Sequence, residues 1–327
     1  MAVIEIDGLT KVYHSTVGNI VALDHLNLEV EKNEVFAMLG PNGSGKTTTL
    51  KLLMGLIFPT EGEARVMGEK TRWSVNFKKY IGYLPEGPYF YPFLNAVELM
   101  ELYGGMFSLD SKTIKTRTEE LLKLVGMWER RNERVSNYSK GMMQRVGLAQ
   151  AMINDPDIIF LDEPTSGLDP VGSREMRDLM SNLKARGKTV FLCSHLLAQV
   201  EQVCDRVAIL HRGKLLKVAS VEELLVQQEL REITVGGAGP ALEAQLAPMA
   251  EKTAVKDDGL LVVTAKNDHS VFQIIELVGR TQGAQLVSVT PPTKTLEDAF
   301  IEVVGADAIK AGSMQVPATA AELGTEL

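Results

Sequence analysis

A glycine-rich loop at residues 40–48 carries the most recognisable chemistry in this 327-residue chain. Its spacing, Gly-x-x-x-x-Gly-Lys-Thr, lets backbone N–H groups close around phosphate oxygens at a helix N-terminus. Lys46 is expected to reach the β and γ phosphates, and the Thr47 hydroxyl to bind Mg²⁺. An apolar run before the loop and a helical stretch after it disfavour a chance turn. We therefore predict that a nucleoside triphosphate binds these loop residues: Gly40, Pro41, Asn42, Gly43, Ser44, Gly45, Lys46, Thr47 and Thr48.

Two adjacent carboxylates, Asp162 and Glu163, end the apolar run at residues 158–161. Like charges at a strand tip repel each other unless each has a separate task. We expect Asp162 to hold Mg²⁺, directly or through water, and Glu163 to act as the general base on the attacking water. The alternative is a solvated strand end, which the apolar residues before the pair disfavour.

Two further side chains are candidates for the same site. His195 follows the next apolar run, 190–193, where a neutral imidazole could hydrogen-bond the γ-phosphate and help to position the attacking water. Tyr13 precedes a polar loop and could stack on a base, or it could pack as an ordinary strand aromatic. We favour the catalytic interpretation for His195, whereas for Tyr13 the two alternatives stay open.

The apolar runs predict an α/β fold that positions these residues. Alternation over residues 3–39 is typical of antiparallel strands at a sheet edge. Strands and helices that alternate over 158–210 indicate a mostly parallel sheet, and residues 87–150 read as a helical insertion. We expect a P-loop NTPase core at residues 1–229.

A second unit is predicted after residue 229. Its order of strands and helices is βαββαβ, which is typical of a small ferredoxin-like α+β domain over residues 230–304. An Asp-Asp-Gly turn at 257–259 is a hairpin signal between its middle strands. Residues 305–327 are rich in Ala, Gly and Thr, and we expect them to form a disordered tail.

Charge and composition limit the classes of partner. Residues 231–327 carry 7 Lys and Arg against 13 Asp and Glu, within a net charge of −8 for the chain. An acidic balance argues against nucleic acid as the main partner. No apolar run approaches the length of a membrane helix, and no signal peptide is evident, so we expect a cytosolic protein. Cys193 and Cys204 read as small apolar residues rather than metal ligands.

The run at residues 138–145, Tyr-Ser-Lys-Gly-Met-Met-Gln-Arg, precedes the acidic strand. Ser139 at the start of a helix places a hydroxyl and free N–H groups at an anion site, although it could equally be an ordinary N-cap. Five motifs follow one another along the chain in a characteristic order. They are the glycine-rich loop, this run, the Asp-Glu pair, the segment 166–169 and Ser194-His195. In that order they resemble the ATP-binding subunit of an ABC transporter, and the resemblance spans residues 3–213.

The resemblance implies how these residues work together. Two copies of the chain would bind two ATP and Mg²⁺ head to tail, with Ser139 and Gly141 of one copy capping the γ-phosphate held by the other. Asp169 would connect the two sites. A separately encoded integral membrane subunit would be the other partner, which places this chain at the cytoplasmic face of the cell membrane.

Departures from the common family pattern are similar to those of bacterial exporters. Lys140 and Met142 replace a Gly and a Gln of the usual run, and Glu86 stands where most relatives carry Gln. A carboxylate at position 86 can still bind Mg²⁺ and take part in catalysis. The C-terminal unit resembles the domain appended in the subgroup of drug, polysaccharide and ion exporters, so we expect export.

An aromatic cluster, Tyr-Phe-Tyr-Pro-Phe at residues 89–93, follows Glu86. Some of these rings are expected to be core, and others could line a groove for a helix of the membrane subunit. There are two alternatives to a transport ATPase: a soluble relative that acts on translation or nucleic acid, and a regulatory subunit that does not hydrolyse ATP. The single cassette and the acidic charge disfavour the first, and the presence of Glu163 and Ser139 disfavours the second.

Overall fold

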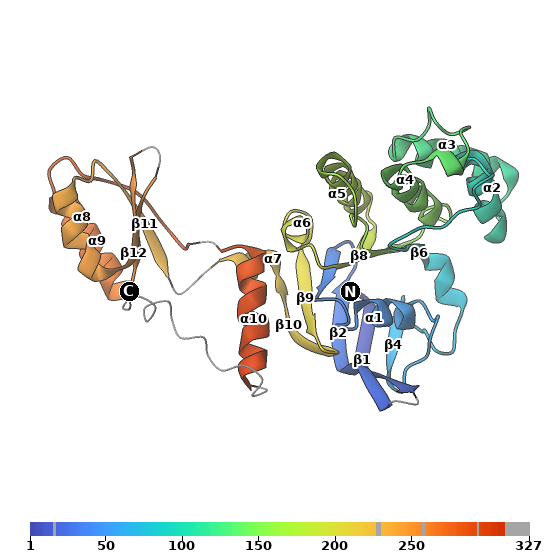
Figure 1. The fold of residues 1–327 in the computed structure, drawn as a ribbon, viewed down its shortest axis with the longest axis horizontal. Coiled ribbons are helices and arrows are strands. Elements are labelled where there is room, and N and C mark those ends of the chain that lie inside the picture. Colours follow the sequence, from blue (N-terminus) through green and yellow to red (C-terminus); the bar gives the residue numbers. More distant parts are fainter. Residues whose placement is uncertain (16–17, 227–229, 257–258, 293, 311–327) are drawn as a thin grey trace, which may run out of the picture. The chain divides into compact units, whose positions relative to one another are not determined.

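The computed structural model describes residues 1–15, 18–226, 230–256, 259–292 and 294–310 (Figure 1). It forms two compact units, Met1–Val221 with the described chain from Phe300 onward, and Glu222–Ala299. No helix in these described ranges has the length and apolar run that a membrane span requires.

A six-stranded sheet forms the centre of the first unit. Five of its strands run parallel to one another, and the edge strand at Lys214–Ser220 runs antiparallel to its neighbour. In spatial order the strands are β10 (Lys214–Ser220), β9 (Arg206–His211), β3 (Val35–Leu39), β8 (Thr189–Ser194), β7 (Ile158–Asp162) and β6 (Ile81–Leu84). Every residue of β3, β7 and β8 is buried, because strands of a parallel sheet are covered on both faces. The predicted mostly parallel sheet is confirmed.

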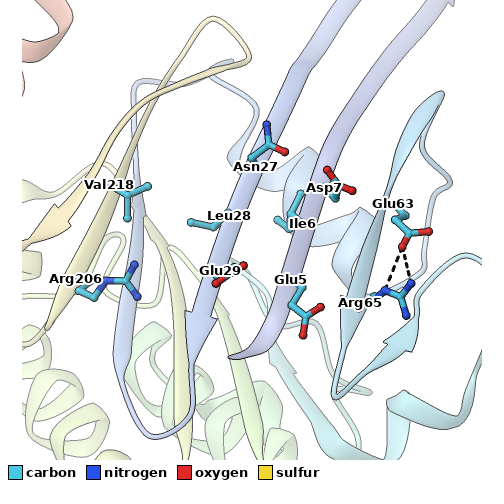
Figure 2. A pocket seen from close by; sticks show the side chains of 10 residues that line it. All are labelled: Glu5, Ile6, Asp7, Asn27, Leu28, Glu29, Glu63, Arg65, Arg206 and Val218. Atoms are coloured by element: carbon cyan, nitrogen blue, oxygen red, sulfur yellow. Dashed lines mark hydrogen bonds and ion pairs between the residues drawn. The ribbon is translucent and has the colours of Figure 1, made fainter. Parts of the chain in front are cut away.

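The predicted antiparallel edge is a second sheet of four strands. Its spatial order is β2 (Gly18–Glu31), β1 (Ala2–Ser15), β4 (Glu61–Val66) and β5 (Glu69–Lys70). One face buries the apolar positions of these strands in the core of the unit. The other face is polar and borders a hollow of about 550 Å³, where Glu5 lies opposite Glu29 and Arg65 pairs with Glu63 (Figure 2). This hollow contains none of the predicted site residues.

Helices cover the central sheet and build the insertion. Those of the core are α1 (Lys46–Leu53), α5 (Pro170–Ala185) and α6 (Leu197–Glu201), with a short 3₁₀ helix at Asn76–Tyr80. The insertion consists of α2 (Ala96–Met106), α3 (Ser111–Leu124), a 3₁₀ turn at Val135–Asn137 and α4 (Lys140–Ala151), grouped together in Figure 1. Its helices begin at strong N-caps: Asn95 forms a capping box with Glu98, and Asp110 accepts two backbone N–H groups.

The second unit has the strand order of a ferredoxin-like domain. Along the chain it contains β11 (Arg231–Gly236), α8 (Pro240–Leu246), a 3₁₀ turn (Ala247–Met249), β12 (Ala250–Val255), β13 (Leu261–Ala265), α9 (Asp268–Arg280) and β14 (Gln285–Thr290). The strands form an antiparallel sheet in the order β12-β13-β11-β14. Two buried residues of α9, Ile274 and Val278, pack on the apolar face of this sheet.

Two helices at the ends of the second unit were not fully predicted from the sequence. α7 (Val221–Leu225) lies at the start of the second unit, and α10 (Leu296–Lys310) begins in its last residues and continues past Ala299. The tail predicted from residue 305 therefore starts too early, since the alanines at 306 and 308 favour helix and carry α10 through Gly305. Residues 257 and 258 of the predicted turn, and 311–327 of the predicted tail, lie outside the described residues.

Candidate nucleotide-binding site

The glycine-rich loop connects β3 to α1, and its glycines are required by sterics. Gly45 has a φ of 112° and Gly43 a φ of 80°, in the left-handed region that side chains disfavour. A methyl group on Gly40 would lie 2.3 Å from the Leu210 carbonyl oxygen, and one on Gly45 would lie 2.6 Å from the Ala22 carbonyl oxygen. The loop can therefore hold its tight path against β9 and β2 only with hydrogen at these positions.

A hollow of about 330 Å³ lies over this loop and collects most of the predicted site residues. Its lining is Tyr13, Ile20, Val21, Ala22, Asn42, Gly43, Ser44, Gly45, Lys46, Thr47, Thr48, Glu86, Asp162 and Glu163. The Tyr13 ring is 39% exposed, with Lys11 Nζ lying 5.1 Å from its centroid. Tyr13 thus borders the phosphate loop and is partly exposed there.

Two buried polar groups of the loop fit a polyanion. Lys46 is 6% exposed, and its Nζ donates to the carbonyl oxygen of Gly40 at 2.6 Å and lies 3.7 Å from Glu163 Oε1. Ser44 Oγ is buried and has no hydrogen-bond partner within the described residues. A buried cation and an unsatisfied hydroxyl at the N-terminus of α1 are groups that phosphate oxygens would satisfy.

The Thr47 hydroxyl and the Asp162 carboxylate face each other across the hollow, with Oγ1 and Oδ2 3.5 Å apart. Burial, followed by the charges of Glu163 and Glu86, raises the pKa of Asp162. A divalent cation beside Asp162 would reverse this effect, because it favours the ionised carboxylate. No group of three or more Asp, Glu, His or Cys in the described chain forms a metal cage. The donor set fits Mg²⁺, which commonly takes one or two carboxylates and completes its shell with phosphates and water.

Glu163 is held in one position by its neighbours. It is 6% exposed, has a φ of 48°, and its N–H donates to the Cys193 carbonyl oxygen at 2.9 Å. Its Oε2 lies 2.9 Å from His195 Nδ1 and accepts the His195 backbone N–H at 3.3 Å. The structure therefore brings His195 to Glu163, although His195 does not line the hollow itself.

Glu86 is tied to two side chains whose role was not predicted. Its Oε1 accepts the Ser166 hydroxyl at 3.2 Å, and its backbone carbonyl accepts the Gln144 side-chain N–H at 2.7 Å. Gln144 belongs to the run at residues 138–145 and is completely buried in α4. A polar residue on the buried face of a helix was the available signal, but its partner, 58 positions away, is set by the tertiary fold.

Ser139, Gly141 and Asp169 lie elsewhere, in a second hollow of about 420 Å³. Ser139 Oγ accepts the Met142 N–H at 3.3 Å as the N-cap of α4, and Asp169 caps α5 by accepting the Gly172 N–H at 2.8 Å. None of the residues lining this hollow lines the hollow over the phosphate loop. Within one chain, the predicted nucleotide contacts are therefore divided between two separate surfaces.

The aromatic cluster is also divided. Phe90 is 5% exposed and belongs to the core, whereas Tyr89, Tyr91 and Phe93 are 85%, 52% and 64% exposed. Tyr89 borders another hollow, also of about 330 Å³, between the core and the insertion, together with Leu56 and Tyr103.

This fold and site define an α/β nucleoside triphosphatase of the P-loop class. The sequence profile of the ABC transporter family matches residues 23–166. An uncharacterised ABC transporter ATP-binding protein of Nostoc is 40% identical over 87% of this chain and 84% of its own length. The chain belongs to the ATP-binding proteins of ABC transporters.

Two relatives have names that describe transported compounds. The bacitracin transport ATP-binding protein of Bacillus licheniformis is 31% identical over 94% of this chain and 99% of its own. The fluoroquinolones export ATP-binding protein of Mycobacterium tuberculosis is 33% identical over 93% of each chain. Among solved structures, a dimeric ATP-binding cassette in a post-hydrolysis state with ADP and Pi is 30% identical, with a TM-score of 0.61 over 67% of this chain and 98% of its own.

The family recognised from the sequence is thereby confirmed, as is the P-loop fold. The chain is the ATP-binding, ATP-hydrolysing subunit of an ABC transporter. The comparisons do not favour the alternative of a soluble ATPase that acts on translation or nucleic acid.

Proposed function

We propose that two copies of this chain close head to tail around two ATP and drive a separately encoded membrane subunit in export. The observation that carries this proposal is the division of the predicted nucleotide contacts between two hollows of one chain. The hollow with the phosphate loop and the hollow with Ser139 and Gly141 would each form one half of a nucleotide site. In a two-fold dimer, the loop hollow of each copy would face the Ser139 hollow of the other copy, so two complete sites would form, since such an interface repeats every contact.

The residues in the loop hollow would bind the triphosphate and its metal. Lys46, Ser44 and the loop N–H groups would hold phosphate oxygens, and Thr47, Asp162 and Glu86 would hold Mg²⁺. Bound there, Mg²⁺ would neutralise negative charge on the phosphates. Tyr13 would stack on the adenine. Ser139 and Gly141 of the partner copy would donate to the γ-phosphate, with Asp169 connecting the two sites.

Glu163 would act as the general base. Its buried carboxylate lies beside Lys46 and is oriented by two contacts with His195. It would take a proton from the attacking water, while His195 would keep the carboxylate aimed at that water and would hydrogen-bond the γ-phosphate. Positioning by His195 would restrict Glu163 to the orientation that the in-line attack requires.

The hollow beside the aromatic cluster would receive the membrane subunit. The exposed Tyr89, Tyr91 and Phe93 rings offer large apolar surfaces for a short helix of that partner. The chain would then act at the cytoplasmic face of the cell membrane. Export is supported by the relatives named for bacitracin transport and fluoroquinolone export, and a compound of one of these kinds is the substrate that we propose.

We also propose that the ATPase domain spans residues 1–229, with its helical subdomain at about 87–150, and that residues 230–304 form an accessory domain. The compact unit at Glu222–Ala299 supports this division.

Complementation between two inactive variants tests the divided site. Lys46→Ala inactivates the loop half, and Gly141→Asp places a negative charge in the other half. A side chain at Gly141 fits, since its first carbon would lie 3.7 Å from the nearest atom of Leu168. Each variant alone should be inactive. A mixed dimer should retain one intact site, so an equimolar mixture should recover about a quarter of the wild-type ATPase rate if the copies pair at random. No recovery in mixtures shown to contain mixed dimers would refute the head-to-tail arrangement.

A further inference from the structure

The segment between β5 and β6 differs in charge from the rest of the molecule. Residues 70–80 contain Lys70, Arg72, Lys78 and Lys79 and no Asp or Glu, in a chain whose net charge is −8. Lys70 pairs with Glu63 at 2.5 Å. Within the described residues, the other three cations make no ion pair with a carboxylate, so this segment presents unneutralised positive charge.

Large apolar side chains are exposed among these cations. Trp73 is 76% exposed and Val75 is 71% exposed. The Arg72 guanidinium lies over the Trp73 ring at 4.8 Å, and Lys79 Nζ lies over the Tyr80 ring at the same distance. Each ring therefore has a cation against its face, which is the combination that suits the boundary between water and hydrocarbon.

The segment is anchored to the core of the first unit by a buried side chain and by close packing against the chain after α1. Phe77 is completely buried, and a methyl group on Gly55 would lie 2.9 Å from the Thr71 carbonyl oxygen and 3.2 Å from the Phe77 ring. The chain after α1 thus packs directly under the segment, and its own Leu56 is 58% exposed. The exposed Trp73 is consequently presented by an ordered turn rather than by a chain end.

We propose that the basic-aromatic patch, defined as Arg72, Trp73, Val75, Lys78 and Lys79, binds the anionic headgroups of a lipid bilayer. Cations attract such a surface, and Trp is enriched at the headgroup level, where its ring is apolar and its N–H is polar. An acidic protein surface would match the charges but would leave Trp73 and Val75 without apolar contact. Nucleic acid is disfavoured by the net negative charge of the chain.

The position of the patch agrees with the proposed function, on which this step rests. Lys78 lines the hollow beside the aromatic cluster, where the membrane subunit is proposed to bind. A chain docked through that hollow would present the patch toward the bilayer that surrounds the subunit. Lipid contact would then orient the ATPase and strengthen its attachment to the membrane subunit.

Tryptophan fluorescence of the full chain tests the proposal, because the chain has two tryptophans, Trp73 and Trp128. With Trp128→Phe, the emission comes from Trp73 alone. Vesicles of phosphatidylcholine and phosphatidylglycerol at 3:1 should shift this emission to the blue, and brominated lipid should quench it. Pure phosphatidylcholine vesicles should do neither. The Trp73→Phe chain, which keeps Trp128, should show no quenching.

Charge variants in the Trp128→Phe background separate lipid binding by the basic-aromatic patch from a general attraction of positive charge to anionic vesicles. Arg72→Gln/Lys79→Gln should weaken binding to the anionic vesicles by about fivefold for each charge removed. Lys112→Gln/Lys115→Gln removes the same charge from α3 and should leave binding within about twofold. Equal binding to both vesicle types, or equal losses in the two double variants, would overturn the proposal. The complementation test above contains no lipid, so its failure would be a separate result.

Discussion

Glu163→Gln should separate catalysis from nucleotide binding. Gln has nearly the same shape as Glu, and its carbonyl oxygen can still accept the His195 backbone N–H, which reaches Glu163 Oε2 at 3.3 Å. The change removes the base and also one negative charge 3.7 Å from Lys46. Hydrolysis should therefore fail while the site keeps its form.

The expected size of the loss follows from the surroundings of Glu163. General bases typically contribute about 10²–10⁴-fold. The structure favours the upper part of this range, because the nearby carboxylates are committed elsewhere: Asp162 faces Thr47, and Glu86 accepts from Ser166. We expect kcat to fall by about 10³–10⁴-fold, which corresponds to about 4–5.5 kcal/mol at 1.36 kcal/mol per tenfold change.

ATP binding should respond in the opposite direction. Removal of a buried negative charge next to a polyanion reduces repulsion, so the Kd for ATP should be equal or lower. Single-turnover hydrolysis measures the chemical step, and size-exclusion chromatography with ATP measures the dimer that the slow variant should accumulate. A kcat within tenfold of wild type would refute Glu163 as the base. A large loss of ATP affinity would refute the inference that the site keeps its form.

Three further outcomes are expected from residues around the site. Asp162→Asn should raise the Tm measured without Mg²⁺ at neutral pH, because the folded state raises the pKa of Asp162 and so disfavours its ionised form. This gain should shrink as the pH falls and vanish below the ordinary pKa of 3.8, where both states of the wild type are protonated. Gly40→Ala should abolish ATP binding in a nucleotide fluorescence titration, since its methyl group would lie 2.3 Å from a backbone oxygen, whereas Gly87→Ala meets no atom within 4 Å and should bind normally. Phe93→Ala should preserve ATPase activity in solution but lower transport per ATP in reconstituted vesicles, whereas the buried Phe90→Ala should cost about 3–5 kcal/mol of unfolding free energy in denaturant titrations. Unchanged transport per ATP for Phe93→Ala would contradict the proposed docking surface.

Local patterns in the sequence were enough to predict the central sheet and the phosphate loop. An apolar run such as Val35–Leu39, followed by glycines and a lysine at fixed spacing, clearly predicts a buried strand. The βαββαβ order of the second unit also follows from local alternation, although its strand pairing is a matter of topology.

Contacts between distant segments could not be predicted in the same way. Nothing near Glu86 indicates that Ser166 would donate to its carboxylate, since these residues are 80 positions apart. The aromatic cluster shows the same limit. Phe90 and Phe93 have the same side chain, and only the packing of the insertion decides that one is buried and the other is exposed.

The division of the nucleotide contacts between two hollows has a consequence for the cell's ATP pool. A reaction that needs two copies of one chain follows mass action, so its rate at low abundance varies with the square of the protein concentration. Dilute chains would then consume little ATP. A membrane subunit that holds two copies raises their effective concentration to the millimolar range, which is ample for pairing. Turnover would therefore be confined to the place where it performs transport, and no separate inhibitor would be required.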